Sequence, residues 1–325
     1  MAKNSNLRKA QKAKQDEFYT QLVDIENELK HYKDHFKGKV IFCNCDDPEE
    51  SNFWKYFQLN FEFLGLKKLI STHFDDEKPS YKLELFGDID GDGRVTKGDI
   101  IKTPLKQNGD FRSPECIEIL QEADIVVTNP PFSLFREYIA QLVEYDKKFI
   151  ILGNNNSIIC KEIFPLIKDN KLWLGYNSNK TFEFRVPDGY KFSREDDNGK
   201  YGKVPAISWF TNLETKKRTE DLLLFRTYNE KDYPKYDHID AIKVDKVKDI
   251  PMDYYETMAV PITFLSNYNP MQFEIIDALN RYSLLDTQSI NDYIKKIKSH
   301  CCNFNGEATY CRILIKRKQN NADNT

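Results

Sequence analysis

The first half of the chain alternates short apolar segments with segments of helical periodicity, and this alternation most constrains the fold. The predicted strands are short, apolar and rich in β-branched residues: 39–45, 67–74, 124–128 and 148–152. The predicted helices show apolar residues at helical spacing: 24–36, 53–61, 114–122, 134–143 (capped by Ser133) and 158–167. Alternation of this kind is typical of a doubly wound, mostly parallel sheet, so we expect an α/β fold.

The pattern changes after about residue 173. Aromatic and β-branched residues separated by Gly and Pro predict antiparallel strands up to about residue 215. Beyond that point the chain is rich in Tyr, Lys and Pro without clear alternation. We therefore expect two domains, 1–215 and 216–325, with an acidic hairpin inserted at about 81–104.

Composition excludes several classes of protein. Hydrophobic residues make up 40% of the chain, which is too many for a disordered protein, and the longest apolar runs are too short to span a bilayer. Seven cysteines without regular spacing do not form a secreted disulfide framework, and Met1–Ser5 lacks the apolar stretch of a signal peptide. We expect a soluble, cytoplasmic protein that has no membrane partner.

Charge is nearly balanced overall but unevenly distributed. There are 48 basic and 51 acidic residues, a net charge of −3. Basic residues gather at 3–14, 216–218 and 295–318. Such clusters can neutralise phosphates, and they can equally be solvated tails, so charge alone leaves both interpretations open.

The segment Asp124–Phe132 carries the clearest chemistry. An apolar strand leads into Asn129-Pro130-Pro131-Phe132. The prolines remove two N–H donors, so the loop offers two acceptors, the Asn129 side-chain oxygen and the Pro130 carbonyl, beside an aromatic ring. Two converging acceptors and a ring fit a planar substrate with an amino group. Accepting both N–H hydrogens frees the amine lone pair for attack without a base, so the segment predicts electrostatic preorganisation.

Five motifs, in order and covering nearly the whole chain, resemble the EcoRI-type adenine-specific DNA methyltransferases. They are Asp16-Glu-Phe-Tyr-Thr-Gln21, Cys43-Asn-Cys-Asp-Asp-Pro48, Gly109-Asp-Phe-Arg-Ser113, Asn129-Pro-Pro-Phe-Ser-Leu-Phe-Arg-Glu-Tyr138 and Val260-Pro-Ile-Thr-Phe-Leu265. The resemblance implies a site-specific enzyme that flips an adenine out of duplex DNA. It would transfer a methyl group from S-adenosylmethionine to N6, with Asn129, Pro130, Pro131 and Phe132 as catalytic residues.

The resemblance also implies which residues bind the methyl donor. These are Asp16, Phe18, Tyr19 and Thr20 around its methionine end, Cys45, Asp46 and Asp47 after the first strand, and Asp110 and Phe111 on its adenine. Asp75 or Asp76 could accept from its ribose hydroxyls. The Gly-rich loop usual after the first strand in the wider superfamily is missing here.

The same resemblance assigns roles to the two domains. Residues 1–215 would form the catalytic domain, and 216–325 would recognise the target sequence in DNA. A restriction endonuclease that shares the site is a possible partner, with no stable complex implied.

Other functions remain open at this stage. Asn-Pro-Pro-aromatic motifs also serve N-methylation of RNA adenine and of protein glutamine, and a catalytically inactive DNA-binding relative is conceivable. Asp88–Asp99 has the spacing of a calcium loop, although Asp-Gly pairs also make hairpin turns. His300, Cys301, Cys302 and Cys311 could ligate zinc, but buried thiols are the simpler interpretation. We expect no bound metal.

Overall fold

The chain divides into two compact units. The computed structural model describes residues 19–45, 47–75, 80–186, 191–197, 199–236, 239–279, 303–304, 307–308 and 310–319. The first unit comprises 1–157 and 174–213, and the second comprises 158–173 and 214–325. Segment 158–173 thus groups with the C-terminal part of the chain.

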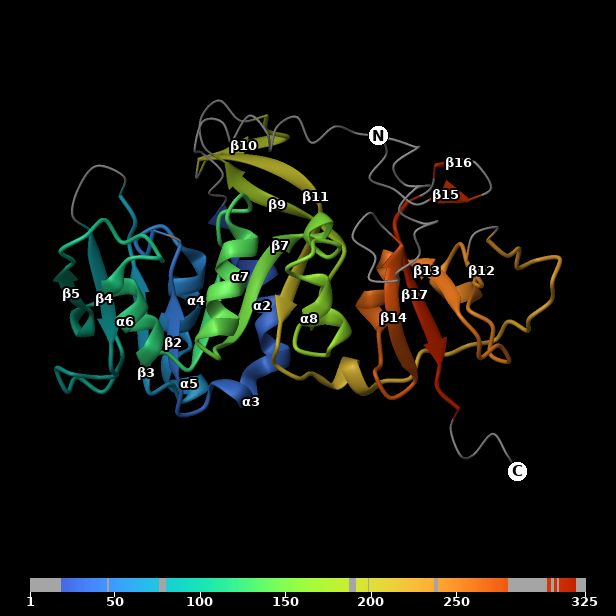
Figure 1. The fold of residues 1–325 in the computed structure, drawn as a ribbon. Helices are drawn as coiled ribbons and strands as arrows, with labels where there is room; N and C mark the ends of the chain where they lie inside the picture. Colours follow the sequence, from blue (N-terminus) through green and yellow to red (C-terminus); the bar gives the residue numbers. More distant parts are fainter. Residues whose placement is uncertain are drawn as a thin grey trace. The chain divides into compact units, whose positions relative to one another are not determined.

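The first unit contains a large mixed sheet with the strand order β1-β9-β11-β7-β6-β2-β3-β4-β5 (Figure 1). Its centre is parallel: β3 (Lys68–Thr72), β2 (Val40–Cys43), β6 (Ile125–Thr128) and β7 (Lys148–Asn154). The flanks pair antiparallel: β4 (Tyr81–Leu85) and β5 (Ile101–Pro104) beyond β3, and β11 (Gly199–Thr211), β9 (Lys180–Val186), β1 (Tyr19–Thr20) and β10 (Arg194–Asp196) beyond β7. β8 is a two-residue strand (Trp173–Leu174).

The expected α/β fold is confirmed, and the expected parallel pairing describes the centre of the sheet. The flanks are antiparallel because β4 and β5, like β9 and β11, are connected as hairpins rather than through crossover helices. The acidic insertion at 81–104 is such a hairpin, in which Tyr81 pairs with Pro104.

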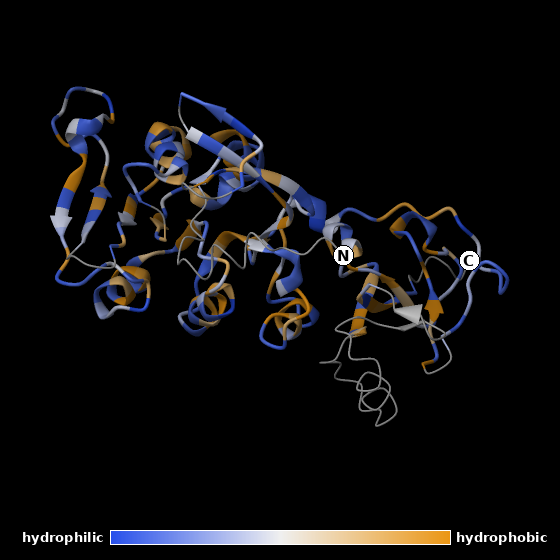
Figure 2. Ribbon diagram, turned by 90° about the horizontal axis from the view of Figure 1, so that it is seen from above, coloured by the Kyte–Doolittle hydropathy of each residue, from blue (hydrophilic) through white to orange (hydrophobic). Residues whose placement is uncertain are grey.

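Helices cover both faces of the central strands (Figure 1). One face packs against α2 (Leu22–Leu29), η1 (Lys30–Tyr32), α3 (Lys33–Phe36), α4 (Asn52–Leu59) and α5 (Phe61–Leu64). The other face is covered by α6 (Pro114–Glu122) and α7 (Phe135–Glu144). The short η2 (Lys97–Asp99) and η3 (Asn155–Ser157) lie in connections. Figure 2 shows that the helices carry both hydrophobic and hydrophilic residues, as expected for helices with one buried side.

Two helix starts differ from the sequence prediction. The helix predicted at 114–122 is α6, and the Ser113 side chain caps it by accepting from the Cys116 N–H at 3.3 Å. Ser133 is not the N-cap residue of α7. That position belongs to Leu134, whose side chain makes no capping hydrogen bond, and the helix begins at Phe135. The chain first makes a turn in which the Leu134 N–H donates to the Pro131 carbonyl at 2.9 Å. The helix predicted at 158–167 is limited to α8 (Phe164–Lys168), with Pro165 in its first turn.

The second unit has its own small sheet of order β12-β13-β17-β14. Its elements are α8, η4 (Lys216–Thr219), β12 (Ile242–Lys243), η5 (Val247–Asp249), β13 (Met258–Pro261), η6 (Ile262–Asn267), β14 (Phe273–Leu279) and β17 (Arg312–Arg317), with a separate pair, β15 (Asn303–Phe304) and β16 (Glu307–Ala308). Ala259, Leu279 and Leu314 lie in its core. Nowhere in the described residues is there a helix with the length and apolar composition of a membrane span.

A buried carboxylate holds the chain that enters the β9–β11 hairpin. Glu28 of α2 is fully buried and accepts from the Tyr32 hydroxyl at 2.9 Å and from the backbone N–H groups of Tyr176 and Asn177, each at 2.7 Å. Gly175 must stay small, because a Cβ there would lie 2.4 Å from Glu28 Oε1. Burial raises the Glu28 pKa, and these hydrogen bonds oppose the rise.

We predict that Glu28→Gln destabilises the protein by about 1–3 kcal/mol, because the new amide NH2 group must face a buried N–H or O–H donor. The free energy of unfolding in urea measures this effect. Glu26→Gln is the matched control, since Glu26 is exposed on the same helix and should change stability little. Equal effects of both substitutions would contradict the role given to Glu28.

Candidate active site

The ends of two parallel strands are joined by Asn44, which directly follows β2 and is buried. Its backbone carbonyl accepts from the Thr128 hydroxyl at the end of β6, and its side-chain oxygen accepts from the Tyr138 hydroxyl of α7. One asparagine therefore ties together β2, β6 and the helix that follows the Asn-Pro-Pro-Phe segment. In parallel sheets this carboxyl edge is where ligands bind.

Asn129 follows β6 at this edge and is 4% exposed. Pro130 is also buried, whereas Pro131 and Phe132 are partly exposed. The Phe132 ring lies edge-on to that of Phe184 in β9, with centroids 6.4 Å apart. The segment thus places its two acceptors at the strand end and its ring at the rim.

The β9–β11 hairpin extends beyond this edge (Figure 1). Ile207 of β11 pairs with Asn154, the last residue of β7, so residues 199–206 and their β9 partners continue past the end of β7. At the outer side β1 joins the hairpin, with Thr20 opposite Phe184. The hairpin and β1 therefore form a wall beside the Asn129–Phe132 segment.

The described part of the predicted methionine-binding segment lies in this wall. The Thr20 carbonyl accepts from Asn52 Nδ2 at 2.7 Å, which ties β1 to the start of α4. Thr20 Oγ1 is buried and has no hydrogen-bond partner among the residues described. The Tyr19 ring contacts the guanidinium of Arg185, 4.6 Å from its centroid. Asp16 and Phe18 lie outside the described residues.

The residues after β2 turn toward the end of β3. Cys43 lies in the core, whereas Cys45 lies beyond the end of the strand. β2 ends at Cys43, and Cys45 has a φ of 67° because the chain turns there. Asp47 lies near the Tyr81 hydroxyl (3.4 Å) and His73 Nε2 (3.9 Å). Asp46 lies outside the described residues.

The Asp110–Phe111 loop is held against the segment that follows β3. Gly109 approaches this segment so closely that a Cβ would lie 1.9 Å from the His73 carbonyl oxygen. The Asp75 N–H donates to the Asn108 carbonyl at 2.9 Å, and Asp76 lies outside the described residues. The sequence candidates at the ends of β3, β2 and β6 therefore lie along one edge of the sheet.

Asp110 and Phe111 also contact other residues of the protein. The Phe111 ring is buried edge-on against Tyr138, with centroids 5.0 Å apart. Asp110 accepts from Arg112 through both carboxylate oxygens, at 2.8 Å from Nε and 2.6 Å from Nη2. The Arg112 hydrogen bonds lower the Asp110 pKa. Oδ1 also accepts from the Arg112 backbone N–H at 2.9 Å, so the remaining acceptor capacity is on Oδ2.

Sequence reasoning did not single out two buried carboxamides at the end of β7. Asn154 is 9% and Asn155 is 7% exposed, and they lie beside β6, the strand that Asn129 follows. The available signal was a run of three asparagines, Asn154–Asn156, directly after a buried apolar strand.

The acidic loop forms a compact cluster of its own. Asp88, Asp90 and Asp99 bring carboxylate oxygens within 4.8 Å of one another. Asp99 accepts from the backbone N–H groups of Ile89 and Thr96, each at 2.7 Å. Backbone hydrogen bonds of this kind are sufficient to hold the three carboxylates close to one another. Of the zinc candidates, His300, Cys301 and Cys302 lie outside the described residues.

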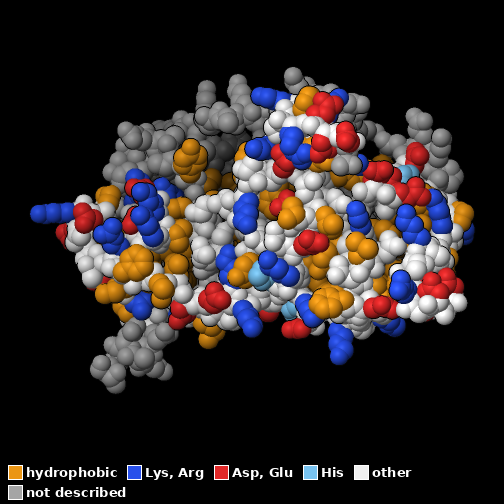
Figure 3. Space-filling model, turned by 180° about the vertical axis from the view of Figure 1, so that it is seen from behind, with side chains coloured by type: hydrophobic (Ala, Val, Ile, Leu, Met, Phe, Trp, Pro, Cys, Tyr) orange, Lys and Arg blue, Asp and Glu red, His pale blue; other side chains and the backbone are white. Residues whose placement is uncertain are grey.

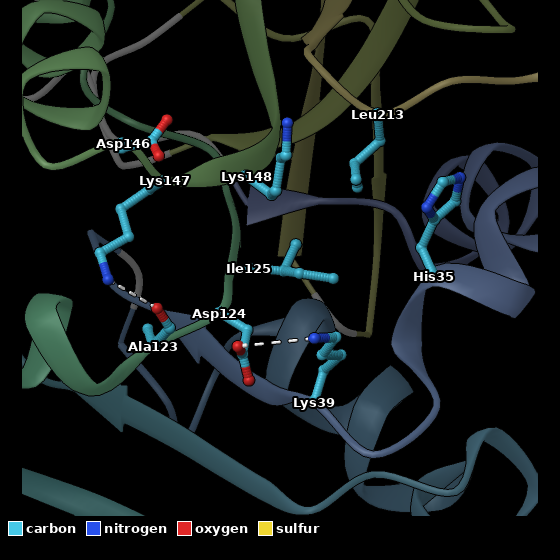
Figure 4. Close-up of a pocket in the computed structure, with 9 residues that line it drawn as sticks. All are labelled: His35, Lys39, Ala123, Asp124, Ile125, Asp146, Lys147, Lys148 and Leu213. Atoms are coloured by element: carbon cyan, nitrogen blue, oxygen red, sulfur yellow. Dashed lines mark hydrogen bonds and ion pairs between the residues drawn. The ribbon is translucent and has the colours of Figure 1, made fainter.

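A cavity of about 400 Å³ lies at the opposite, amino-terminal edge of the same strands (Figure 4). Two of the lysines that line it have partners in the protein. Lys147 Nζ donates to the Ala123 carbonyl at 2.8 Å, and Lys39 lies 3.7 Å from Asp124. None of the sequence-predicted site residues lines it.

Comparison with known proteins identifies the class of enzyme. A family described as "Adenine-specific methyltransferase EcoRI" matches residues 6–318. Type II methyltransferase M.EcoRI of Escherichia coli is 46% identical over 334 residues, which cover 98% of each chain. M.MgeORF184P of Mycoplasma genitalium and M.MpnI of Mycoplasma pneumoniae, also Type II methyltransferases, are 45% and 43% identical over 96% of this chain and 98% of their own.

The protein is therefore an adenine-specific methyltransferase. It belongs to the EcoRI methylase family, which confirms the resemblance found in the five motifs.

We predict that Arg112→Gln raises the Asp110 pKa toward its ordinary value of 3.8. A lowered carboxyl pKa stabilises the fold above the ordinary pKa, and this stabilisation is lost as pH falls through the lowered value. The variant should therefore be less stable than the parent at neutral pH and lose less stability on acidification. Urea unfolding at several pH values measures this. In an Asp110→Asn background, Arg112→Gln should leave unchanged the slope of the free energy of unfolding against pH in the acid range.

Proposed function

We propose that this enzyme methylates N6 of an adenine flipped out of duplex DNA at a specific sequence, and that S-adenosylmethionine is the donor. The observation that carries the proposal is the position of Asn129 and Pro130 at the carboxyl end of β6, beside a wall built from β1 and the β9–β11 hairpin. The names of the relatives, Type II methyltransferases, support DNA as the substrate.

In this proposal Asn129 and Pro130 act by accepting hydrogen bonds. The Asn129 side-chain oxygen and the Pro130 carbonyl each accept one N6 hydrogen, which directs the nitrogen lone pair away from the ring system and toward the methyl group. Asn129 is 4% exposed, so it is largely shielded from water, and fixed dipoles act more strongly there than in solvent. No ionisable base is required for the attack, and N6 loses one of its protons to solvent after the methyl group has been transferred. Pro131 fixes the backbone so that the two acceptors converge.

Phe132 would stack on the flipped base. Extruding a base from the duplex costs a few kcal/mol, which stacking and the two hydrogen bonds offset in part. The ring is partly exposed, and Phe184 contacts it edge-on, which supports it without covering the site.

The donor would lie along the ends of β2 and β3. S-adenosylmethionine, when bound, supplies a sulfonium methyl group that is open to nucleophilic displacement. The residues present fit this ligand because Thr20 Oγ1 is a buried acceptor and donor with no partner in the described part of the chain, and Asp110 retains acceptor capacity. Asp16, Phe18, Tyr19 and Thr20 would hold the methionine end, Cys45, Asp46 and Asp47 the middle, and Asp110 and Phe111 the adenine.

The second unit would recognise the target sequence. Not all of its basic residues are available for phosphates. Arg218, one of the cluster 216–218, is buried, lies over the Trp173 ring at 3.9 Å and donates to Asn170 at 2.9 Å. Arg312 likewise pairs with Asp245 at 3.0 Å. Exposed residues such as Lys216 remain candidates.

No extended basic area is visible on the face shown in Figure 3, where basic and acidic side chains are interspersed. The basic clusters at 3–14 and 295–298 lie outside the described residues. We also propose a cytoplasmic location, and a cognate endonuclease that shares the site without a stable complex.

We predict that Asn129→Ala retains binding of S-adenosylmethionine and DNA but lowers turnover by about a hundredfold or more, because one of the two acceptors is lost. Methyl transfer to a target duplex under single-turnover conditions measures this. Asn212→Ala is the control. It removes a paired carboxamide at the amino end of β7 and should affect stability rather than turnover. Turnover like that of the parent in Asn129→Ala would refute the mechanism.

We also predict that affinity for the target duplex falls steeply with salt, with a log–log slope of about 0.9 for each phosphate neutralised. Titrations of a labelled duplex at several salt concentrations measure the slope. Affinity that hardly changes with salt would show that the basic residues do not contact the DNA backbone.

A further inference from the structure

Asn154 has a buried amide group whose hydrogen-bonding capacity the protein does not use. Its side chain is 9% exposed, and within the described residues its Nδ2 atom has no hydrogen-bond partner. A buried donor without a partner destabilises the fold, because it has lost its hydration and gained no hydrogen bond in return. At the edge of a candidate active site, such a donor indicates a group that is paired when the substrate is bound.

The orientation of the Asn154 amide is set by its other end. Asn154 Oδ1 accepts from the Asn156 backbone N–H at 2.9 Å, so the oxygen is the atom that faces the backbone and Nδ2 is the atom left over. The turn itself is held by the next residue, because Asn155 Nδ2 donates to Asn179 Oδ1 at 2.9 Å. The unused atom is therefore a donor on a fixed segment.

Strand register brings this donor close to Asn129. Thr128 of β6 pairs with Ile151 of β7, so Asn129 lies opposite Leu152. Asn154 is two residues further along β7 than Leu152. Because side chains two residues apart in a strand point to the same face of the sheet, the side chains of Leu152 and Asn154 lie on one face. With a rise of about 3.3 Å per residue and strands about 4.8 Å apart, the Cα atoms of Asn129 and Asn154 lie about 8 Å from each other.

This spacing suits the two neighbouring polar groups on one edge of adenine. That edge presents the N6 amino group and the N1 acceptor side by side. If Asn129 and Pro130 accept from N6, the adjacent N1 requires a donor. Guanine and hypoxanthine instead carry a hydrogen on N1, which a donor would repel.

We propose that Asn154 is a specificity-determining residue whose Nδ2 donates a hydrogen bond to N1 of the flipped adenine. This inference rests on the proposed function and adds the residue that distinguishes adenine from purines that are protonated at N1. Asn155 positions Asn154 through its bond to Asn179.

The test compares methylation of a target duplex containing adenine with one containing 1-deazaadenine, which has C–H in place of N1. We expect kcat/KM of the parent enzyme to fall about tenfold or more with 1-deazaadenine. Asn154→Asp keeps an oxygen for the Asn156 N–H and loses the donor. We expect this variant to methylate adenine more slowly than the parent and to show little further loss with 1-deazaadenine.

Two controls separate N1 recognition from general damage. Asn212→Asp makes the same chemical change in a carboxamide whose two ends are both paired, at 3.0 Å and 2.9 Å, at the far end of β7. It should retain the full preference for adenine. With a duplex that contains 7-deazaadenine, which keeps N1, kcat/KM should change by the same factor in the parent and in Asn154→Asp.

The outcomes are distinct. Loss of the adenine preference in Asn154→Asp alone supports the proposal. If Asn154→Asp discriminates against 1-deazaadenine as strongly as the parent, or if the parent does not discriminate at all, the proposal is wrong. If the parent fails to methylate adenine in duplex DNA, the proposed function itself fails.

Discussion

The edge of the sheet that carries the candidate active site depends on the two hydrogen bonds that converge on Asn44. The carbonyl of this residue accepts from Thr128 and its side chain accepts from Tyr138, so one buried asparagine sets β6 and α7 relative to β2. The Asn129–Phe132 segment connects β6 to α7. Because both of its ends are held, its two acceptors can be fixed without a Gly-rich loop or an ionised group. Preorganised dipoles of this kind lose no energy to rearrangement during the reaction.

The order of the central strands and helices in the first unit could be predicted from the sequence because the signals for them are local. Apolar runs bounded by turns gave the four central strands, and Ser113-Pro114 gave the start of α6. The N-cap position predicted for Ser133 and the length of the helix predicted at 158–167 differ from the structure. Cap residues are common in turns as well, and a helix start depends on the path of the preceding chain, here the turn closed by Pro131 and Leu134.

Pairings between distant residues could not be read from sequence. Glu28 and Asn177 are far apart in the chain, and a glutamate at helical spacing looks like a solvated residue until the turn that it holds is known. Arg218 is a similar case, since it belongs to a basic cluster in sequence but is buried over Trp173. A charged residue becomes structural through its partners, and these are brought to it by the fold.

The same reasoning explains why asparagine recurs at the ends of the parallel strands. Asn44, Asn129 and Asn154 follow or end three neighbouring strands, and all are buried. A buried carboxylate at these positions would bring a desolvation cost and, with the donor and substrate proposed above, a charge near a sulfonium and a phosphate backbone. An amide offers a donor and an acceptor without a charge, so it can match the alternating polar edge of a base. Asn44 uses this capacity on the protein itself, whereas Asn129 and Asn154 lie where a substrate can use it.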